Sequence, residues 1–585
     1  MIAASARLAR LAWLVSMTAS ATFAPAAARA QAFDRVAPQL PAPPAKPEIT
    51  TPGPISPPPS FDRTVLVPEL KGVVFVDGAA ALQPAGLGPE AAPRGVAAPG
   101  LPLLAGADFA SRVAPYIGRP LTLADVDAIT LMARETYRAN GHPFIAISVP
   151  PQNVQRGVIQ VVVIEYRVGK VAVKGERYFS AGQIRGMSDL NSGEVLTLPR
   201  LRKQLDDFNQ NPFLTVSAAV QPGADPGYTD VVLQASDRRP LRIYAGYDNQ
   251  GVRSLGRDEW NVGFNWGNAF GLGQIMSYQY TRSFSGRYYS NSFSDVIPLG
   301  GDHKIILFGA YGVQIPQVAE GFNSNGHSGQ ASARFASDLW SGSWFKQSLL
   351  IGADYKRTNS DLEFSGFRVL DTAAEIVQFP LTYDLTLTDH YGQTVIENQF
   401  VYAPGNLTAF NTDEAIGALV PGATANYIYD RLSATRTTPL PHGVTWVIRV
   451  LGQATSHNLP YSEQIGGGGI GVVRGYDPNA ALGSRGVLAS TEFLAPAFSP
   501  TRLFTKHAAA ADQLQFGAFF DYAHLIQPQP VPDVPSNATL SSIGVNAHYI
   551  AKHFTLQIEV GSQLRRAPGR DELGTEAAVV ASVGF

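Results

Sequence analysis

The sequence predicts a membrane β-barrel of antiparallel strands, most simply sixteen, preceded by two small α/β domains. Three observations carry this prediction. Apolar and polar residues alternate along long segments from about residue 240 onward, a strand–helices–strand–strand pattern occurs twice between 66 and 238, and the first 30 residues resemble an export signal. Alternation with a period of two places apolar side chains on one face of a strand and polar side chains on the other.

The composition excludes several classes of protein. Only 16% of the 585 residues are charged, against roughly 25% in typical soluble proteins. The 45 Lys and Arg nearly balance the 47 Asp and Glu, which argues against a nucleic-acid binder. The absence of cysteine excludes disulfide scaffolds, thiolate zinc sites and cysteine nucleophiles. Beyond residue 30 no run of about 18 apolar residues occurs, so the sequence predicts no membrane-spanning helix.

The N-terminus predicts export. Arg7 and Arg10 precede a short apolar stretch at 11–24, and an Ala-Arg-Ala tripeptide offers a cleavage site between Ala30 and Gln31. We therefore predict a secretory signal peptide over 1–30, because the apolar stretch is too short to span a membrane. Residues 31–65 are expected to be an N-terminal peptide followed by a proline-rich linker, which has too many prolines for a helix or a central strand.

The two α/β domains are expected at 66–166 and 167–238. In the first, Thr122 is a good N-cap for a helix whose apolar residues include Val126, Ile129 and Tyr137. An Ala/Gly/Pro-rich stretch at 78–106 is expected to be an inserted surface loop. The second domain repeats the order of elements, and neither carries a cluster typical of a catalytic site.

The barrel is expected over 239–585. In one strand Trp260, Val262 and Phe264 alternate with polar or small residues. Aromatic-rich apolar faces opposite polar faces suit a closed barrel with lipid outside and water inside. Sixteen strands would leave about 22 residues for each strand with its connection, although twelve or fourteen fit the length almost as well. The chain ends on Phe585 at the end of an alternating strand, and we predict that this residue is the signal read by the bacterial barrel-assembly machinery.

Four stretches carry a resemblance to a known family. Because they occur in the family's order, the sequence resembles the two-partner secretion transporters (TpsB type, the ShlB/FhaC/HecB haemolysin secretion/activation proteins). The superfamily of these transporters includes the barrel-assembly protein BamA. The four stretches are YRANGHPFIAIS and its continuation (137–175), NQNPFLTVSAAV and its continuation (209–237), YDNQGVRSLGRD and its continuation (247–274), and YSEQIGGGGIGVVRGY and its continuation (461–493). The resemblance implies that the two α/β domains are periplasmic POTRA domains.

The last stretch contains the VRGY motif of the family. The motif comprises Val473, Arg474, Gly475 and Tyr476. The resemblance implies that it lies on a loop, about 461–485, folded back into the barrel lumen, with the arginine against an acidic residue of an inward-facing strand.

The acidic partner follows from periodicity combined with the family's F-x-D-x-G motif. In the strand around 516–525 the inward set contains Phe519 and Asp521, so Asp521 is the expected partner of Arg474. Ala523 stands where the family has glycine, which leaves a close approach of the loop backbone in question at that point. The alternative is a solvated loop arginine and an ordinary pore-lining acid.

The resemblance implies an outer-membrane transporter, without enzymatic activity, that exports a large secreted exoprotein (TpsA type). The POTRA domains would capture the unfolded exoprotein in the periplasm, and the barrel would conduct it outward. Outer-membrane lipid and the barrel-assembly machinery are further expected partners, and a monomer is expected.

The histidines show no metal-ligand spacing and the glycine run at 466–469 lacks a following Lys-Ser/Thr, so neither metal nor cofactor is predicted. The alternatives are a barrel-assembly factor like BamA or TamA, a diffusion porin and, least supported, an outer-membrane hydrolase. Many relatives have an N-terminal helix that occludes the barrel, but only 31–36 precede the linker here, which is too short for a stable helix.

Overall fold

The computed structural model describes residues 34–41, 49–50, 62–87, 94–318, 322–342, 344–364, 367–504, 512–530 and 535–585. The predicted signal peptide, with its cleavage site between Ala30 and Gln31, lies outside these ranges. The chain divides into two compact units, one comprising residues 43–238 and the other comprising 1–42 together with 239–585. Within the described ranges, every helix is too short or too polar to cross a bilayer.

The unit 43–238 contains two α/β domains. Its first domain comprises β2 (Val65–Val67), β3 (Gly72–Asp77), β4 (Gly95–Ala97), α2 (Ala107–Val113), β5 (Leu121–Thr122), α3 (Leu123–Ala139), β6 (Ile145–Ser148) and β7 (Val158–Glu165). The second comprises β8 (Arg167–Lys174), α4 (Ala181–Gly186), α5 (Leu198–Phe208), β9 (Leu214–Pro222) and β10 (Tyr228–Asp237), joined by β1 (Ile49–Thr50) from the N-terminal segment. The sheets have the orders β4-β3-β7-β6 and β1-β9-β10-β8, so in each domain the third strand of the repeat is central.

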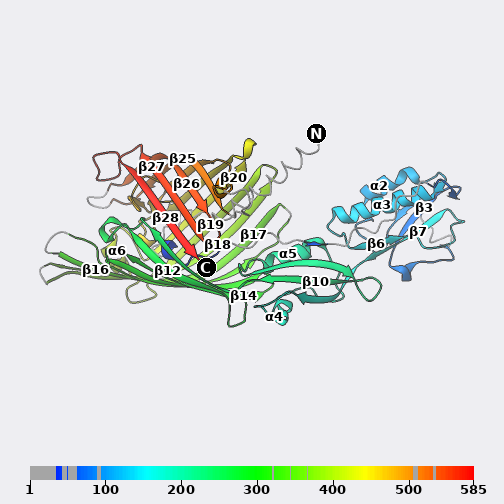
Figure 1. Ribbon diagram of the computed structural model, residues 1–585, viewed down its shortest axis with the longest axis horizontal. Coiled ribbons are helices and arrows are strands. Elements are labelled where there is room, and N and C mark those ends of the chain that lie inside the picture. The colour runs from blue at the N-terminus through cyan, green and yellow to red at the C-terminus, as the bar shows by residue number, and fades with distance from the viewer. Residues whose placement is uncertain are drawn as a thin grey trace. The chain divides into compact units, whose positions relative to one another are not determined.

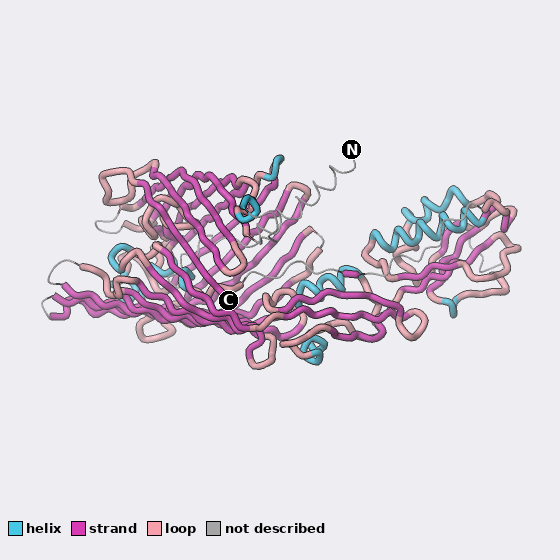
Figure 2. The backbone as a smooth tube through the Cα atoms, viewed as in Figure 1, coloured by secondary structure: helices cyan, strands magenta, loops and turns pink. Residues whose placement is uncertain are grey.

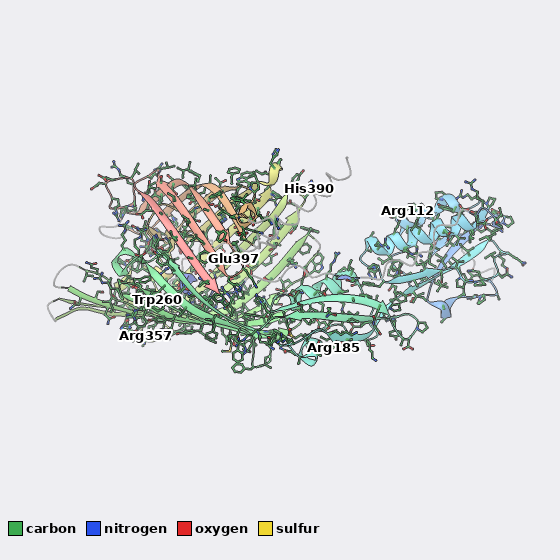
Figure 3. The ribbon with its side chains drawn as sticks, viewed as in Figure 1. Arg112, Arg185, Trp260, Arg357, His390 and Glu397 are labelled. Atoms are coloured by element: carbon green, nitrogen blue, oxygen red, sulfur yellow. The ribbon has the colours of Figure 1, made fainter. Side chains whose placement is uncertain are left out.

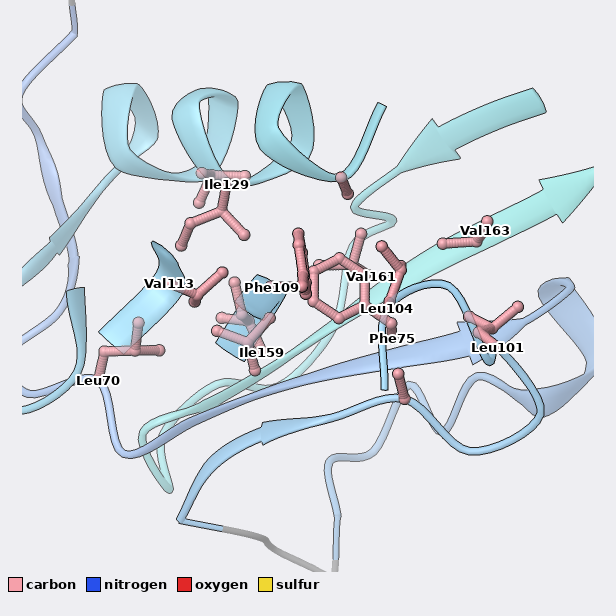
Figure 4. Packing of buried hydrophobic residues seen from close by; sticks show 14 of the residues in the cluster. Leu70, Phe75, Leu101, Leu104, Phe109, Val113, Ile129, Ile159, Val161 and Val163 are labelled. Atoms are coloured by element: carbon pink, nitrogen blue, oxygen red, sulfur yellow. The ribbon is translucent and has the colours of Figure 1, made fainter. Parts of the chain in front are cut away.

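The core of the first domain forms between its helices and sheet. Thr122 and Asp125 form a reciprocal capping box at the start of α3, and Val126, Ile129 and Tyr137 point into the core as the helical spacing predicts. The expectation of a surface loop at 78–106 is wrong in part. Its β4 pairs in parallel with β3, and Leu101 and Leu104 are buried in the same core (Figure 4). The low-complexity composition concealed these two leucines, whose burial removes apolar surface from water and stabilises the segment.

The segment assigned to the linker also contributes to a sheet. Ile49 and Thr50 of β1 pair in parallel with Ala218 and Ala219 of β9, and Ile49 packs against the core of the second domain. Part of the 31–65 segment is therefore a sheet element and not only a spacer. A two-residue pairing between segments more than 160 residues apart has no local sequence pattern from which it could be predicted.

The second unit is a closed barrel. Figure 2 shows its wall built almost entirely of strands, and β28, red in Figure 1, pairs with both β27 and β11 to close the ring. In the described part of the chain sixteen antiparallel strands close the barrel, which confirms the preferred strand number. They are β11 (Leu241–Asp248), β12 (Glu259–Ala269), β13 (Gln274–Ser283), β14 (Tyr288–Gly300), β15 (His303–Gln314), β16 (Phe322–Asp338), β17 (Phe345–Phe364), β18 (Phe367–Asp389), β19 (Gly392–Pro404), β20 (Asn426–Pro439), β21 (Thr445–Thr455), β24 (Arg485–Leu494), β25 (Gln513–Ile526), β26 (Asn537–Ile550), β27 (Phe554–Gln563) and β28 (Thr575–Gly584).

The alternation predicted from the sequence has the expected direction. On β12, whose Trp260 is labelled in Figure 3, Val262 and Phe264 are exposed on the outer surface, whereas Asn261 and Asn265 are buried inside. Apolar side chains thus lie outside and polar side chains inside, the reverse of their distribution in a soluble protein. This distribution fits a barrel wall with lipid outside. The final residue, Phe585, exchanges backbone hydrogen bonds with Ile243 of β11 and has an exposed ring. Its role as an assembly signal remains a prediction.

Candidate functional site

A long connection folds back into the barrel. It links β21 to β24 and contains a 3₁₀ turn (Tyr461–Glu463) and a small antiparallel hairpin of β22 (Ile465–Gly467) and β23 (Ala481–Gly483). Val473 and Tyr476 between the two hairpin strands are almost fully buried. Connections between strands normally lie on the surface of a protein. This one is buried, so we infer that it occupies the barrel lumen. We call residues 456–484 the lumen loop.

The arginine of the VRGY motif is held by Asp521 of β25. One Asp521 oxygen, Oδ2, accepts the backbone N–H of Arg474 at 2.9 Å and its Nε–H at 2.8 Å, while Oδ1 accepts from Nη2 at 2.8 Å. This is a bidentate, charge-assisted pair, and Asp521 is completely buried. The guanidinium also lies over the ring of Phe519, 3.4 Å from its centroid. The structure therefore brings together the three residues that the sequence singled out.

Two further carboxylates face the same guanidinium. Nη1 of Arg474 lies 3.0 Å from Glu492 of β24 and 3.7 Å from Glu559 of β27. Arg449 of β21 pairs with the other oxygen of Glu492 at 2.6 Å. Two guanidiniums thus meet three carboxyl groups, and the formal net charge of these five groups is −1. No motif in the sequence marks the two glutamates, although both occupy inward positions of alternating strands.

The rest of the motif fits the loop against the wall. The hydroxyl of Tyr476 accepts the backbone N–H of Ser541 and lies 2.6 Å from the carbonyl oxygen of Arg565. Gly475 has a left-handed φ of 87°, and a Cβ added there would lie 2.6 Å from the carbonyl oxygen of Gly561 on β27. The loop backbone therefore approaches the wall closely at Gly561. Ala523, at the position left in question, instead packs in the apolar cluster around Val473.

The lumen loop has a second attachment to the wall, which no sequence motif predicts. Glu463 is fully buried and accepts hydrogen bonds from Lys356 of β17 at 2.6 Å, Gln378 of β18 at 3.1 Å and Tyr429 of β20 at 3.0 Å. The loop is thus bound to two separate sectors of the wall, β17–β20 and β24–β27. Glu463 lies in the stretch 461–493 but outside the VRGY motif, and its partners are on distant strands, so the sequence alone does not select it.

The N-terminal peptide also lies inside the barrel. Arg35 donates to Glu259 of β12 at 2.6 and 3.1 Å, and the carbonyl oxygen of Val36 accepts from Gln279 and Ser292 on the inner wall. The backbone N–H of Gln39 donates to the hydroxyl of Tyr244 at 2.9 Å. Within the described residues 34–41, its helical part is a three-residue 3₁₀ turn (Asp34–Val36). We call residues 34–41 the lumen peptide.

The described residues include no group of three or more acidic or histidine side chains placed to hold a metal ion. The ionic clusters described above consist of carboxylates already paired with guanidinium or ammonium groups. Their arrangement is suited to holding a loop and a peptide inside a pore.

These features define a class of outer-membrane protein, a sixteen-stranded barrel whose lumen contains a folded-back loop and which follows a pair of α/β domains. Residues 227–524 match the family model described as haemolysin secretion/activation protein ShlB/FhaC/HecB, and residues 92–165 match the POTRA domain of ShlB type. The chain belongs to the ShlB/FhaC/HecB family of haemolysin secretion/activation proteins.

Known relatives agree with this assignment. The chain is 24% identical over 454 residues to the outer membrane transporter CdiB-2 of Burkholderia pseudomallei, covering 75% of this chain and 74% of that protein. It is 22% identical over 163 residues to the heme/hemopexin transporter protein HuxB of Haemophilus influenzae, covering 28% of this chain and 29% of that protein.

Solved structures show the same fold. CdiB from Escherichia coli superimposes with a TM-score of 0.72 at 19% identity over 91% of this chain and 93% of that chain. CdiB from Acinetobacter baumannii gives 0.61 at 16% identity over 94% and 95%. The predicted family resemblance, outer-membrane location and periplasmic POTRA domains are confirmed.

Proposed function

We propose that this chain exports a large secreted exoprotein through its own barrel, with the lumen loop and the lumen peptide keeping the pore closed between export events. The observation that carries this proposal is the pair of buried attachments inside the lumen. Arg474 binds the loop to one sector of the wall, and Arg35 binds the lumen peptide to another. A transporter that passes an unfolded chain needs such a seal, because an open barrel of sixteen strands would leak small solutes.

The inner wall suits an unfolded polypeptide. Polar uncharged side chains such as Ser277, Gln279 and Ser292 point inward from neighbouring strands and are buried there. They offer hydrogen bonds to a passing backbone without forming an apolar surface to which an unfolded chain would adhere. The POTRA domains capture the partner first, by adding its extended segments to the edge of a sheet.

Direction needs no nucleotide in this mechanism. Folding of the partner outside the cell buries its apolar surface and prevents its return. The lipid-facing aromatic and aliphatic side chains hold the barrel in the outer membrane, and the chain works as a monomer. The barrel-assembly machinery reads Phe585 when the protein is inserted.

The test compares culture supernatants and outer-membrane fractions by mass spectrometry. Cells carry the gene intact, deleted, or restored as Arg474→Ala, and the control is Arg436→Ala, which removes a partly exposed ion pair with Asp389 near a strand end. We expect deletion and Arg474→Ala to remove one or two large proteins from the supernatant, while the membrane profile and the control stay unchanged. A broad loss of other barrels from the membrane would instead identify an assembly factor. No change in either fraction would refute export.

A further inference from the structure

The connection between β19 and β20, residues 405–425, folds back over the inner wall of the barrel. It contains the short helix α6 (Asp413–Leu419), which is labelled in Figure 1. Ile416 of α6 and Val420 just after it are almost fully buried in an apolar cluster with inward-facing residues of three wall strands and one residue of the lumen loop. These partners are Ala374 and Ile376 of β18, Val401 and Ala403 of β19, Tyr427 and Tyr429 of β20, and Leu459 of the lumen loop.

The order of the strands places this connection at the extracellular end of the lumen. The chain passes from β10 of the second periplasmic domain into β11 through residues 238–240, so β11 begins at the periplasmic end. Antiparallel neighbours run in opposite directions, so the β11–β12 connection and every second one after it lie at the extracellular end. The 405–425 connection and the lumen loop both belong to this set. They therefore meet at the extracellular mouth, over the β18–β20 sector.

Asn458 of the lumen loop joins the 405–425 connection to a third extracellular connection. Its buried side chain donates hydrogen bonds to the carbonyl oxygens of Pro421 and Gln529, each at 3.0 Å. The same amide accepts the backbone N–H of Gln529 at 3.0 Å. Gln529 lies between β25 and β26, and the backbone of Ala423 forms a parallel bridge with Asn458. One amide thus holds together backbone groups from two other connections.

Gly422 makes this contact possible. Its φ of 79° is left-handed, and a Cβ added there would lie 2.7 Å from Oε1 of Gln529 and 3.0 Å from Nδ2 of Asn458. A residue with a side chain would therefore hold the turn after α6 away from Asn458. The fit is specific to the closed arrangement of the three connections.

The 405–425 connection keeps its own shape through other contacts. Asp413 accepts the backbone N–H of Ala425 through Oδ1 at 2.7 Å, which ties the beginning of α6 to the end of the connection. Asn411 donates to the carbonyl oxygen of Glu375 on β18 at 2.9 Å, which fixes the first half to the wall. The second half, from Val420 onward, meets the lumen loop at Asn458. The connection is thus a preformed unit with one side fixed to the wall and the other held by neutral hydrogen bonds.

Three sectors of the inner wall carry an occupant in this structure. The lumen peptide is bonded to β12, β13 and β14, and the Arg474 part of the lumen loop is bonded to β24 and β25. The 405–425 connection covers the sector where Glu463 is bonded. An extended chain that leaves the lumen has to displace at least one of them. The neutral hydrogen bonds of Asn458 are weaker than the charge-assisted bonds of Arg474 and Glu463, so the 405–425 connection separates from the lumen loop most readily.

We propose that residues 405–425 form an extracellular lid, that Asn458 is its latch, and that the lid parts from Asn458 when the exported chain leaves the lumen. We call residues 405–425 the lid. This proposal rests on the export function and adds a third closure, at the extracellular end, to the lumen loop and the lumen peptide. It assigns to Asn458 the role of positioning the lid against the lumen loop.

The first experiment locks the lid with a disulfide. Because the chain has no cysteine, the pair Ala423→Cys and Asn458→Cys introduces a single possible bond within the chain. The two positions form a β-bridge, whose residues lie within the Cα separation that a disulfide spans. Full-length protein is produced in cells lacking the native gene, and its amount in the outer membrane and the large proteins of the supernatant are measured with and without a reductant. Each single-cysteine variant is a matched control.

We expect the oxidised pair to export no more than cells with the gene deleted, although it reaches the outer membrane in normal amount. A reductant should restore export, and both single-cysteine variants should export as the wild type does. Export by the oxidised pair at the level of the single variants would overturn the proposal, because the lid would then stay in place during export. If the pair does not reach the membrane, the conductance measurement that follows decides alone.

The second experiment releases the latch and measures the pore without export. Asn458→Ala removes the three hydrogen bonds of the latch. The control Asn426→Ala removes an exposed amide that bonds the carbonyl oxygen of Pro404 at the base of the lid. Each is combined with Arg35→Ala, which frees the lumen peptide, and the purified full-length proteins are placed in planar lipid bilayers. We expect Asn458→Ala to raise the conductance above that of Arg35→Ala alone, and the control to leave it unchanged. Equal conductance in all three proteins would overturn the proposal.

Failure of the export function gives a different result from failure of the lid. If deletion of the gene leaves the supernatant unchanged, export fails, and the conductance comparison still decides whether Asn458 holds a lid closed. If deletion removes proteins from the supernatant and the oxidised pair exports them normally, the lid proposal fails and the export function stands.

Discussion

Replacing either partner of the Arg474–Asp521 pair is expected to have unequal effects. Arg474→Ala leaves Asp521 and Glu559 without a cation. The formal net charge of the buried cluster changes from −1 to −2. Removing one member of a buried ion pair costs about 3 to 5 kcal/mol, because the remaining charge is stranded. Asp521→Asn instead leaves Arg474 with two carboxylates and a neutral cluster. Its cost is that of lost hydrogen bonds to a charged group, about 1.5 to 3 kcal/mol.

The assay is urea unfolding of the purified barrel in detergent, followed by the different gel mobilities of folded and unfolded forms without heating. A difference of about 1.4 kcal/mol changes an equilibrium tenfold, so the two variants are expected to have clearly separated midpoints, with Arg474→Ala the less stable. Arg436→Ala, which affects a partly exposed pair, should stay within about 1 kcal/mol of the wild type. Equal midpoints for Arg474→Ala and wild type would refute the reasoning, since they would mean that water screens the cluster as it would a surface pair.

Three further predictions concern other parts of the chain. Gly475→Ala should destabilise the folded barrel in the same assay, because its φ is left-handed and the new Cβ would lie 2.6 Å from the carbonyl oxygen of Gly561; an unchanged midpoint would contradict the close approach. Arg35→Ala should raise the conductance of the protein in planar lipid bilayers, because it removes the ion pair with the buried Glu259; conductance equal to that of the wild type would show that the lumen peptide does not obstruct the pore. The pKa of Asp237 lies below its usual value. Burial alone would raise this pKa, but the hydrogen bonds that the carboxylate accepts from three consecutive backbone N–H groups before α4 together lower it by more. The stability it supplies is present above its unfolded pKa of about 3.9 and is lost as the pH falls through the lower folded value. Asp237→Asn should therefore lower the thermal unfolding temperature of the full chain at pH 7. Below pH 4 the unfolding temperature of the variant should fall less than that of the wild type, and the same pH dependence in both proteins would refute this.

The barrel could be predicted because membrane strands repeat one simple rule. Each strand alternates a lipid face and a lumen face, as Phe264 and Asn265 do, and this local pattern survives without any knowledge of pairing. The same parity placed Phe519 and Asp521 inside. The number of strands is not contained in the pattern, because chain length alone permits twelve, fourteen or sixteen.

The features that were missed depend on contacts between distant segments. Glu463, Glu492 and Glu559 acquire their importance only when the lumen loop and three parts of the wall meet. Glu463 and Glu492 lie in the stretch 461–493 that carries the family resemblance, but their partners come from distant strands that the stretch does not specify. The pairing of β1 with β9 and the burial of Leu104 within a low-complexity stretch are of the same kind. Composition identifies segments that lack regular structure, but it does not reveal short pieces that are held by a distant partner.

The measurement that tests the central claim most directly asks whether the exported protein passes through the lumen. A photoreactive amino acid is placed at Ser332, on the lumen face of β16 beside the buried Gln330, or at the neighbouring Ala333, which faces outward. Cells are irradiated during export and cross-linked products are identified by mass spectrometry. We predict a cross-link between position 332 and the large supernatant protein, and none from position 333. Continued export without any cross-link at 332, or equal cross-linking at 333, would contradict passage through the barrel.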